Sequence, residues 1–288
     1  MRYLLTPLAV LLALLSASPA PAYLPALAEI YRQIHAQLGR PEAFVFTSRS
    51  RVFTMAPPTG ESGGVTAAEN PDAALVVEER PERTFRQRVS WVAGGPVAVE
   101  TFSDQNELLH LYLEEEGRVR TANLQPFRHF TEMDVEVPYL HFLERDPQNW
   151  LKAMTYWGVV PDRVGLASAY KGAVHYLLVD HTGNEAWIDQ RELRPVRLRT
   201  RVETRGEPVW LGIAFSDFLI FRDRGSQQKW DFPSTTHFYL DGQLFKVSRV
   251  IDVNSNPKRD AMPFDRIRAE LDRQEALEAR FTPVPFAQ

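Results

Sequence analysis

The stretch RPERTFRQRV, residues 80–89, decides the fold class of this sequence. After an Arg-Pro step, Phe85 and Val89 alternate with Arg86 and Arg88. Successive side chains of a β-strand point to opposite faces, so this pattern predicts a strand with one apolar and one wet face. A sheet with one wet face is usually antiparallel, because parallel sheets are covered on both sides.

The same alternation recurs further along the chain. In residues 196–202, apolar residues alternate with Arg197, Arg199 and Arg201. We interpret these arginines as a solvated outer face of the sheet, with an acidic partner or anionic headgroups as the alternative. Residues 44–55 are rich in β-branched and aromatic residues and predict another strand.

Successive predicted strands are separated by short turns, as at Asp241-Gly242, which favours sequential hairpins and an antiparallel meander. A meander of about ten strands must cover its apolar face, either by closing into a barrel or by curling partly under helices. The fold we predict is therefore mainly β (α+β): an open, incomplete antiparallel β-barrel with helices covering the cavity.

Three segments have helical spacing instead. Residues 137–157 interrupt the strands and predict two short aromatic helices, placed to cover the opening of the sheet. Residues 263–279 predict a charged helix that begins at Pro263. An N-terminal helix ends at Gly39 and Pro41, and its apolar stripe comprises Leu27, Ile30, Tyr31, Ile34 and Leu38.

The first 22 residues predict a cleaved secretory signal peptide. Arg2 precedes the apolar run 8–15, and small-x-small sites end at Ala20 and Ala22. The run is shorter than the about 20 apolar residues that span a membrane. The sequence has no cysteine, which excludes disulfides and thiolate metal ligands. We expect residues 23–288 to form a single domain in the periplasm.

Charge and motifs argue against nucleic-acid binding and catalysis. The chain has 33 basic and 37 acidic residues, a net charge of −4, and no basic stripe. Three possible metal ligands or acid–base groups lie close in sequence: His175, Asp180 and His181. No further ligand follows the two histidines at a spacing typical of a metal site, so we interpret the histidines as surface residues. The sequence has no Gly-x-Ser-x-Gly, His-Glu-x-x-His or phosphate-loop motif. We expect no metal, no cofactor and no enzymatic activity.

Several motifs, taken in order, resemble the LolA-type periplasmic lipoprotein carriers. VVEERPERTFRQRV resembles the strand-Arg-Pro-strand element of that family, and SDQNELLHLYLEEEGRV resembles the hairpin that follows it. EAWIDQRELRPVRLRTRV, IAFSDF and HFYLDGQLFKVSRVIDV resemble the second half of the superfamily. The resemblance covers roughly residues 24–256. The chain is longer than a standard carrier, its loop 56–73 is unusual for the family, and its C-terminal helix has no matching element there.

This resemblance implies an apolar cavity that takes the acyl chains of a lipoprotein or another lipid, and no cofactor. It implies a chaperone-like carrier in lipoprotein transport, which receives cargo from an inner-membrane donor and passes it toward an outer-membrane acceptor. In that family the arginine of the Arg-Pro step holds the lid closed and is needed for release of cargo, and Arg80 is the matching position.

The candidate ligand-binding residues are apolar or aromatic, because such side chains tolerate acyl chains of different shapes. The expected lid and cavity residues, with Arg80, are Tyr139, Phe142, Trp150, Met154 and Trp157 on the helices and Phe46, Phe53, Phe85, Trp91, Leu111 and Leu113 on the sheet. Each could equally be an ordinary core residue. The alternative function is a non-catalytic envelope scaffold with a packed interior.

Overall fold

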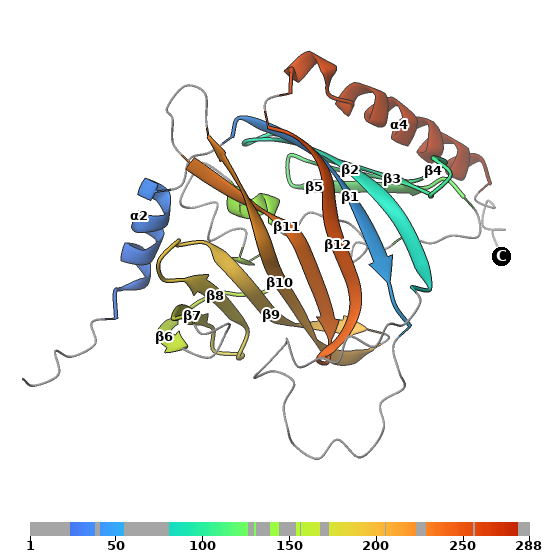
Figure 1. The fold of residues 1–288 in the computed structure, drawn as a ribbon. Helices are drawn as coiled ribbons and strands as arrows, with labels where there is room; N and C mark the ends of the chain where they lie inside the picture. The colour runs from blue at the N-terminus through green and yellow to red at the C-terminus, as the bar shows by residue number, and fades with distance from the viewer. Residues whose placement is uncertain are drawn as a thin grey trace, which may run out of the picture.

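The computed structural model describes residues 24–37, 41–54, 81–125, 130, 139–143, 154–155, 157–167, 173–204, 206–222, 229–255 and 257–281. Their main element is one 12-stranded antiparallel sheet in the order β5-β4-β3-β2-β1-β12-β11-β10-β9-β8-β7-β6. The chain begins in the centre of the sheet at β1, runs outward to β5, and returns from the far edge at β6 to β12 (Figure 1).

The first five strands are β1 (Ala43–Val52), β2 (Arg83–Val92), β3 (Val97–Phe102), β4 (Leu108–Glu115) and β5 (Arg118–Asn123). The returning strands are β6 (Arg163–Ala167), β7 (His175–Val179), β8 (Glu185–Asp189), β9 (Pro195–Thr204), β10 (Glu207–Arg222), β11 (Lys229–Leu240) and β12 (Gln243–Asn254). The helical elements are α2 (Leu27–Gln37), η3 (Leu140–Leu143), η4 (Arg259–Ala261) and α4 (Phe264–Phe281).

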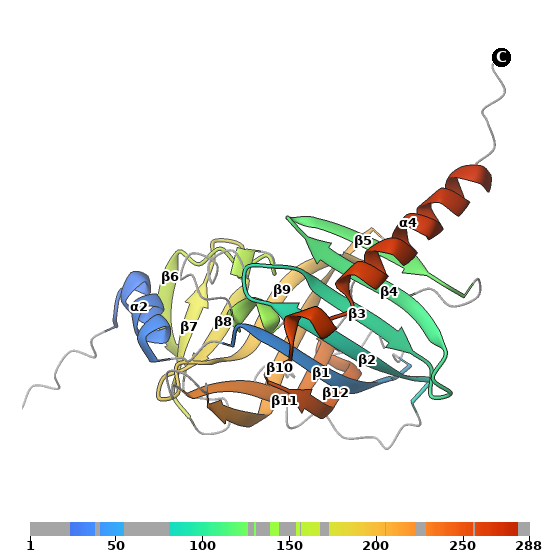
Figure 2. The same cartoon turned by 90° about the horizontal axis from the view of Figure 1, so that it is seen from above.

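Because β5 and β6 are the two ends of the strand order, the sheet curves without closing (Figure 2). The predicted fold class, an open and incomplete antiparallel barrel with helices, is therefore confirmed. The hairpin expected at Asp241-Gly242 is also confirmed: φ is +47° and +82° at these residues, as a type I′ turn requires. Among the described residues, no helix is long and apolar enough to span a membrane.

The two longer helices pack on opposite faces of the sheet. We call the face that carries Phe44 the inner face and the other the outer face. Helix α2 buries Ile30 and Ile34 in the inner-face cluster. Helix α4 lies across the outer face near β3, β4 and β5 (Figures 1 and 2) and buries Ile267 and Leu271 there. Helix α2 thus packs at one end of the sheet, near β6, β7 and β8 (Figures 1 and 2), and α4 covers part of the outer face.

Three of the predicted segments lie partly or wholly outside the described residues. Within residues 137–157, η3 and the helical pair 154–155 are described, and most of the remainder lies outside the described residues. The expected signal peptide, residues 1–22, and the loop 56–73 also lie outside them. The charged helix expected at 263–279 corresponds to α4.

Candidate functional site

The inner face carries an aromatic cluster that spans four central strands. The ring of Phe44 on β1 lies 4.8 Å from that of Phe232, 5.0 Å from that of Trp230 and 6.0 Å from that of Phe221, centroid to centroid. Because β12 lies between β1 and β11 in the sheet, these rings meet across an intervening strand. Phe46 extends the cluster, 4.8 Å from Phe232. The result is a continuous apolar surface that is almost fully buried, apart from the half-buried Phe221.

Between β5 and β6, the described residues 139–143, 154–155 and 157–160 include side chains that pack on this cluster, and we call these residues the covering segment. The ring of Tyr139 lies 5.0 Å from Phe215 and 5.6 Å from Phe232, and burial raises the pKa of Tyr139 well above its usual range. Met154 is completely buried in the same cluster, and its sulfur accepts a hydrogen bond from the hydroxyl of Tyr31 on α2 at 3.6 Å. Tyr31 and Met154 therefore join α2 to the covering segment.

The predicted lid residues are placed as follows. Tyr139 and Met154 lie in the inner cluster, and Trp157 packs against it while half-buried. The side chain of Phe142 and the whole of Trp150 lie outside the described residues, as does Arg80.

The predicted sheet residues fall into separate groups. Phe46 and Trp91 belong to the inner aromatic cluster. Phe85 lies in a small neighbouring cluster, with its ring 5.4 Å from that of Phe130. Phe53, just beyond the end of β1, is half-buried, and its backbone N–H donates to the carbonyl of Phe245.

Leu111 and Leu113 correct an expectation. Both are buried on the outer face beneath α4, in contact with the cluster of Phe264, Ile267 and Leu271, and do not join the inner cluster. Strand β4 is buried on both faces over five successive residues, so its sequence has no alternation from which the inner side could be read.

The other half of the inner face is polar and buried. His110, Thr101, Gln87 and Ser48 stand directly opposite one another across β4, β3, β2 and β1. The Gln87 amide donates to Thr101 at 3.1 Å. The neighbouring row contains Ser50, Ser248 and Thr236, and the hydroxyl of Ser50 lies 3.1 Å from that of Ser248. We call these seven residues the inner polar rows.

A buried cation stands beside the inner polar rows. Lys246 on β12 is fully buried, with its ammonium nitrogen 4.1 Å from the ring centroid of Phe238. Neither the inner polar rows nor the buried Lys246 was predicted from the sequence. The sequence does hold a signal for the rows: β1 continues the alternation of Phe44 and Phe46 with Ser48 and Ser50. This period of two places the two serines on the same face as the phenylalanines.

The C-terminal end of the covering segment is fixed to the sheet by two side chains. The Asn184 amide donates to the carbonyl of Gly158 at 2.6 Å, and Asp180 accepts from the N–H of Val160 at 3.4 Å. Asp180 also accepts from the N–H of Thr182 at 2.8 Å. Burial alone would raise the pKa of Asp180, but these hydrogen bonds outweigh it and hold the pKa below its usual value. Asp180 therefore has a structural role.

The histidines beside Asp180 do not form a metal site. His175 is buried, which corrects the expectation of a surface residue, and burial lowers its pKa; His181 is exposed. Among the described residues, no group of three or more histidine and carboxylate side chains could hold a metal ion.

The arginines of β9 lie on the outer face and are engaged by neighbours. Arg197 stacks over Trp187, with its guanidinium carbon 5.5 Å from the ring centroid. Arg199 and Arg201 lie 4.1 Å and 5.1 Å from the ring centroid of Trp210. Cation–π contacts thus offset the repulsion between these like charges.

Thus the fold and site define an open antiparallel sheet with a covered apolar inner face. No family model and no curated protein matches the chain. Among solved structures, it is similar to a LolA superfamily protein from Nitrosomonas europaea, at 11% identity over 82% of this chain and 96% of that one, with a TM-score of 0.45. It is also similar to a domain named for outer membrane lipoprotein sorting, from Vibrio parahaemolyticus, at 10% identity over 83% and 97%, with a TM-score of 0.46.

Proposed function

We propose that the chain is a periplasmic carrier that binds the acyl chains of a lipoprotein or another lipid against the inner aromatic cluster. The observation that carries this proposal is the buried ring surface of Phe44, Trp230 and Phe232, covered by Tyr139 and Met154. The order of sequence motifs that resembles the LolA-type carriers supports it as well.

The energetics suit a carrier. Burying an acyl chain gains about 0.8 kcal/mol per methylene group, so a soluble carrier needs a large apolar surface that is hidden when empty. The contacts that Tyr139 and Met154 make with the rings hide this surface. When the covering segment moves away, an acyl chain replaces those contacts with its own. Met154 is suited to this exchange because its flexible, polarizable side chain adapts to different neighbours.

The inner polar rows indicate the orientation of the cargo. One half of the inner face is aromatic, and the other presents hydroxyl and amide groups and Lys246. An amphiphile gains most when its acyl chain meets the first half and its polar group meets the second. The proposal has three further parts. Residues 1–22 are a signal peptide that directs the chain to the periplasm. The carrier receives its cargo from an inner-membrane donor and delivers it to an outer-membrane acceptor, and Arg80 is needed for release of the cargo.

The proposal is tested by native mass spectrometry with lipid identification on the mature chain purified from a periplasm. The wild type is compared with Arg80→Leu and with Arg118→Leu, an exposed strand arginine at the sheet edge. The carrier predicts a discrete acylated mass in all three, held more tightly only by Arg80→Leu. An apo mass in all three, with no uptake of a fluorescent fatty acid, contradicts a carrier.

The second candidate is a non-catalytic envelope scaffold. It is favoured by one observation: the described inner side chains pack closely, with ring centroids as near as 4.4 Å between Phe221 and Trp230. A scaffold keeps this interior filled and binds its partner elsewhere. The apo mass described above is the result that this candidate predicts.

A further inference from the structure

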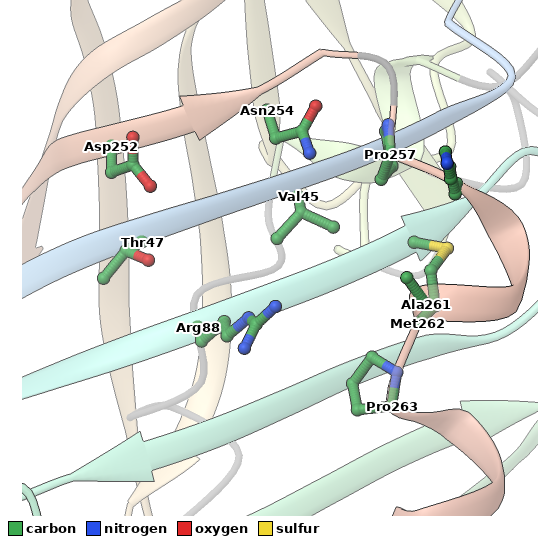
Figure 3. Close-up of a pocket in the computed structure, with 10 residues that line it drawn as sticks. Val45, Thr47, Arg88, Asp252, Asn254, Pro257, Ala261, Met262 and Pro263 are labelled. Carbon is green, nitrogen blue, oxygen red and sulfur yellow. The ribbon is translucent and has the colours of Figure 1, made fainter.

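A pocket of about 330 Å³ lies on the outer face, and Figure 3 shows the residues that line it. Its floor is formed by outward-facing residues of β1, β2 and β12, among them Thr47, Arg88 and Asp252. Its wall is the segment between β12 and α4, which contributes Lys258 and Met262. The pocket therefore combines a polar floor from three strands with a partly apolar wall.

The two cations of the pocket are not neutralised within the described chain. Arg88 and Lys258 are exposed, and neither has an ion pair or side-chain hydrogen bond to any described residue. Glu100 stands directly opposite Arg88 on β3, but its carboxylate pairs with Arg266 of α4. The nearest acid by strand register thus makes its ion pair with α4 and none with Arg88, which lines the pocket.

Positive charge continues from the pocket along the outer face. Arg86, Arg49 and Arg249 stand directly opposite one another on β2, β1 and β12. Like charges in such positions destabilise a sheet. Among the described residues, Arg49 and Arg249 have no acid or aromatic partner, whereas Arg86 bonds the neutral Asn106. The arginines of β9, in contrast, stack on tryptophans.

We infer that this pocket binds the phosphate of a small organic molecule or headgroup, between Arg88 and Lys258. A guanidinium presents a planar fork that matches phosphate oxygens, and an ammonium adds a point charge. The Thr47 hydroxyl supplies a neutral hydrogen-bonding group, and Met262 supplies an apolar contact for the carbon part of the ligand. The row of arginines raises the positive potential that attracts the anion.

Asp252 sets the direction of the ligand. It stands on the opposite side of Thr47 from Arg88, about two strand spacings or ~10 Å away. Its negative charge keeps the phosphate at the Arg88 end of the pocket. A phosphate of a lipid headgroup and that of a soluble ester share this chemistry, and the experiment distinguishes them.

The first experiment is isothermal titration calorimetry of the full mature chain with sn-glycerol 3-phosphate. Saturable binding is expected, weakened about tenfold or more in Arg88→Gln/Lys258→Gln because two charge-assisted contacts are lost. The control is Arg118→Gln/Arg191→Gln, which removes the same charge from exposed sites on other strands and turns. Thermal melting of each variant shows that the fold is retained.

The second experiment is flotation with vesicles of phosphatidylcholine, with and without phosphatidylglycerol. Glycerol phosphate binding together with flotation on the anionic vesicles, both lost in Arg88→Gln/Lys258→Gln, assigns the site to a lipid headgroup. Glycerol phosphate binding without flotation assigns it to a soluble ester. Absence of glycerol phosphate binding, or equal weakening by the control variant, overturns the inference. Neither result bears on acyl binding at the inner face.

Discussion

The position of Gly158 allows the attachment of the covering segment to be tested quantitatively. Gly158 has φ of +74°, and a Cβ atom there would lie 2.8 Å from the Thr200 hydroxyl oxygen. Gly117, in the β4–β5 turn, has the same φ, and a Cβ there would meet no atom within 4 Å. The two glycines therefore share the same positive φ, but only Gly158 has a neighbouring atom that an added Cβ would meet.

The two Gly→Ala substitutions should differ in their effect on the free energy of unfolding. Gly117→Ala is expected to cost about 1–2 kcal/mol, the strain of an L-residue in the left-handed region. Gly158→Ala adds a steric clash and weakens the bond from Asn184, which is worth about 0.5–1.5 kcal/mol. The expected total for Gly158→Ala is about 2–4 kcal/mol.

Urea unfolding of both variants, followed by tryptophan fluorescence, measures these costs. The double variant Gly158→Ala/Thr200→Ala should recover the steric part, because Thr200 Oγ1 has no hydrogen-bond partner among the described residues. Gly158→Ala should also take up a fluorescent fatty acid faster than Gly117→Ala, since its covering segment is less firmly held. Equal unfolding free energies and uptake rates for the two variants would refute the anchoring role.

Three further results are expected. Asp180→Asn should weaken the loss of stability at acidic pH. Because the pKa of Asp180 is lower in the folded than in the unfolded chain, this carboxylate stabilises the fold above its unfolded pKa and loses that effect as pH falls through its folded pKa; urea unfolding across acidic pH measures the difference. Ile267→Ala, completely buried under α4, should cost about 2–4 kcal/mol by urea unfolding, whereas Leu277→Ala on the exposed side of the helix should cost little. Ser50→Ala should lose about 1 kcal/mol with its hydrogen bond, while Ser48→Ala, whose Oγ has no partner among the described residues, should cost nothing.

The open sheet could be predicted from the sequence because apolar and polar residues alternate along its strands and recognisable turn residues separate them. The alternation of Phe85 and Val89 with Arg86 and Arg88 correctly predicts which side chains of β2 are buried. The Asp241-Gly242 pair correctly predicts the hairpin between β11 and β12. These are local features that depend only on neighbouring residues. They are therefore visible without knowledge of the tertiary structure.

Other features depend on contacts between distant residues and were not predictable in this way. The sequence around Leu111 and Leu113 fits either face of the sheet, and only the packing of α4 places these side chains on the outer face. The inner polar rows arise because six strands align their polar residues in register, which no single strand reveals. The role of Asp180 depends on a segment some 20 residues earlier in the chain.

The central claim is that acyl chains bind at the inner aromatic cluster. The most direct measurement is photo-crosslinking of the full mature chain with a diazirine fatty acid, followed by peptide mass spectrometry. The account predicts labels on β1 and β11 near Phe44 and Phe232, and on the covering segment near Tyr139. Labels confined to the outer face beneath α4, or no label above that of an unfolded control, would contradict it.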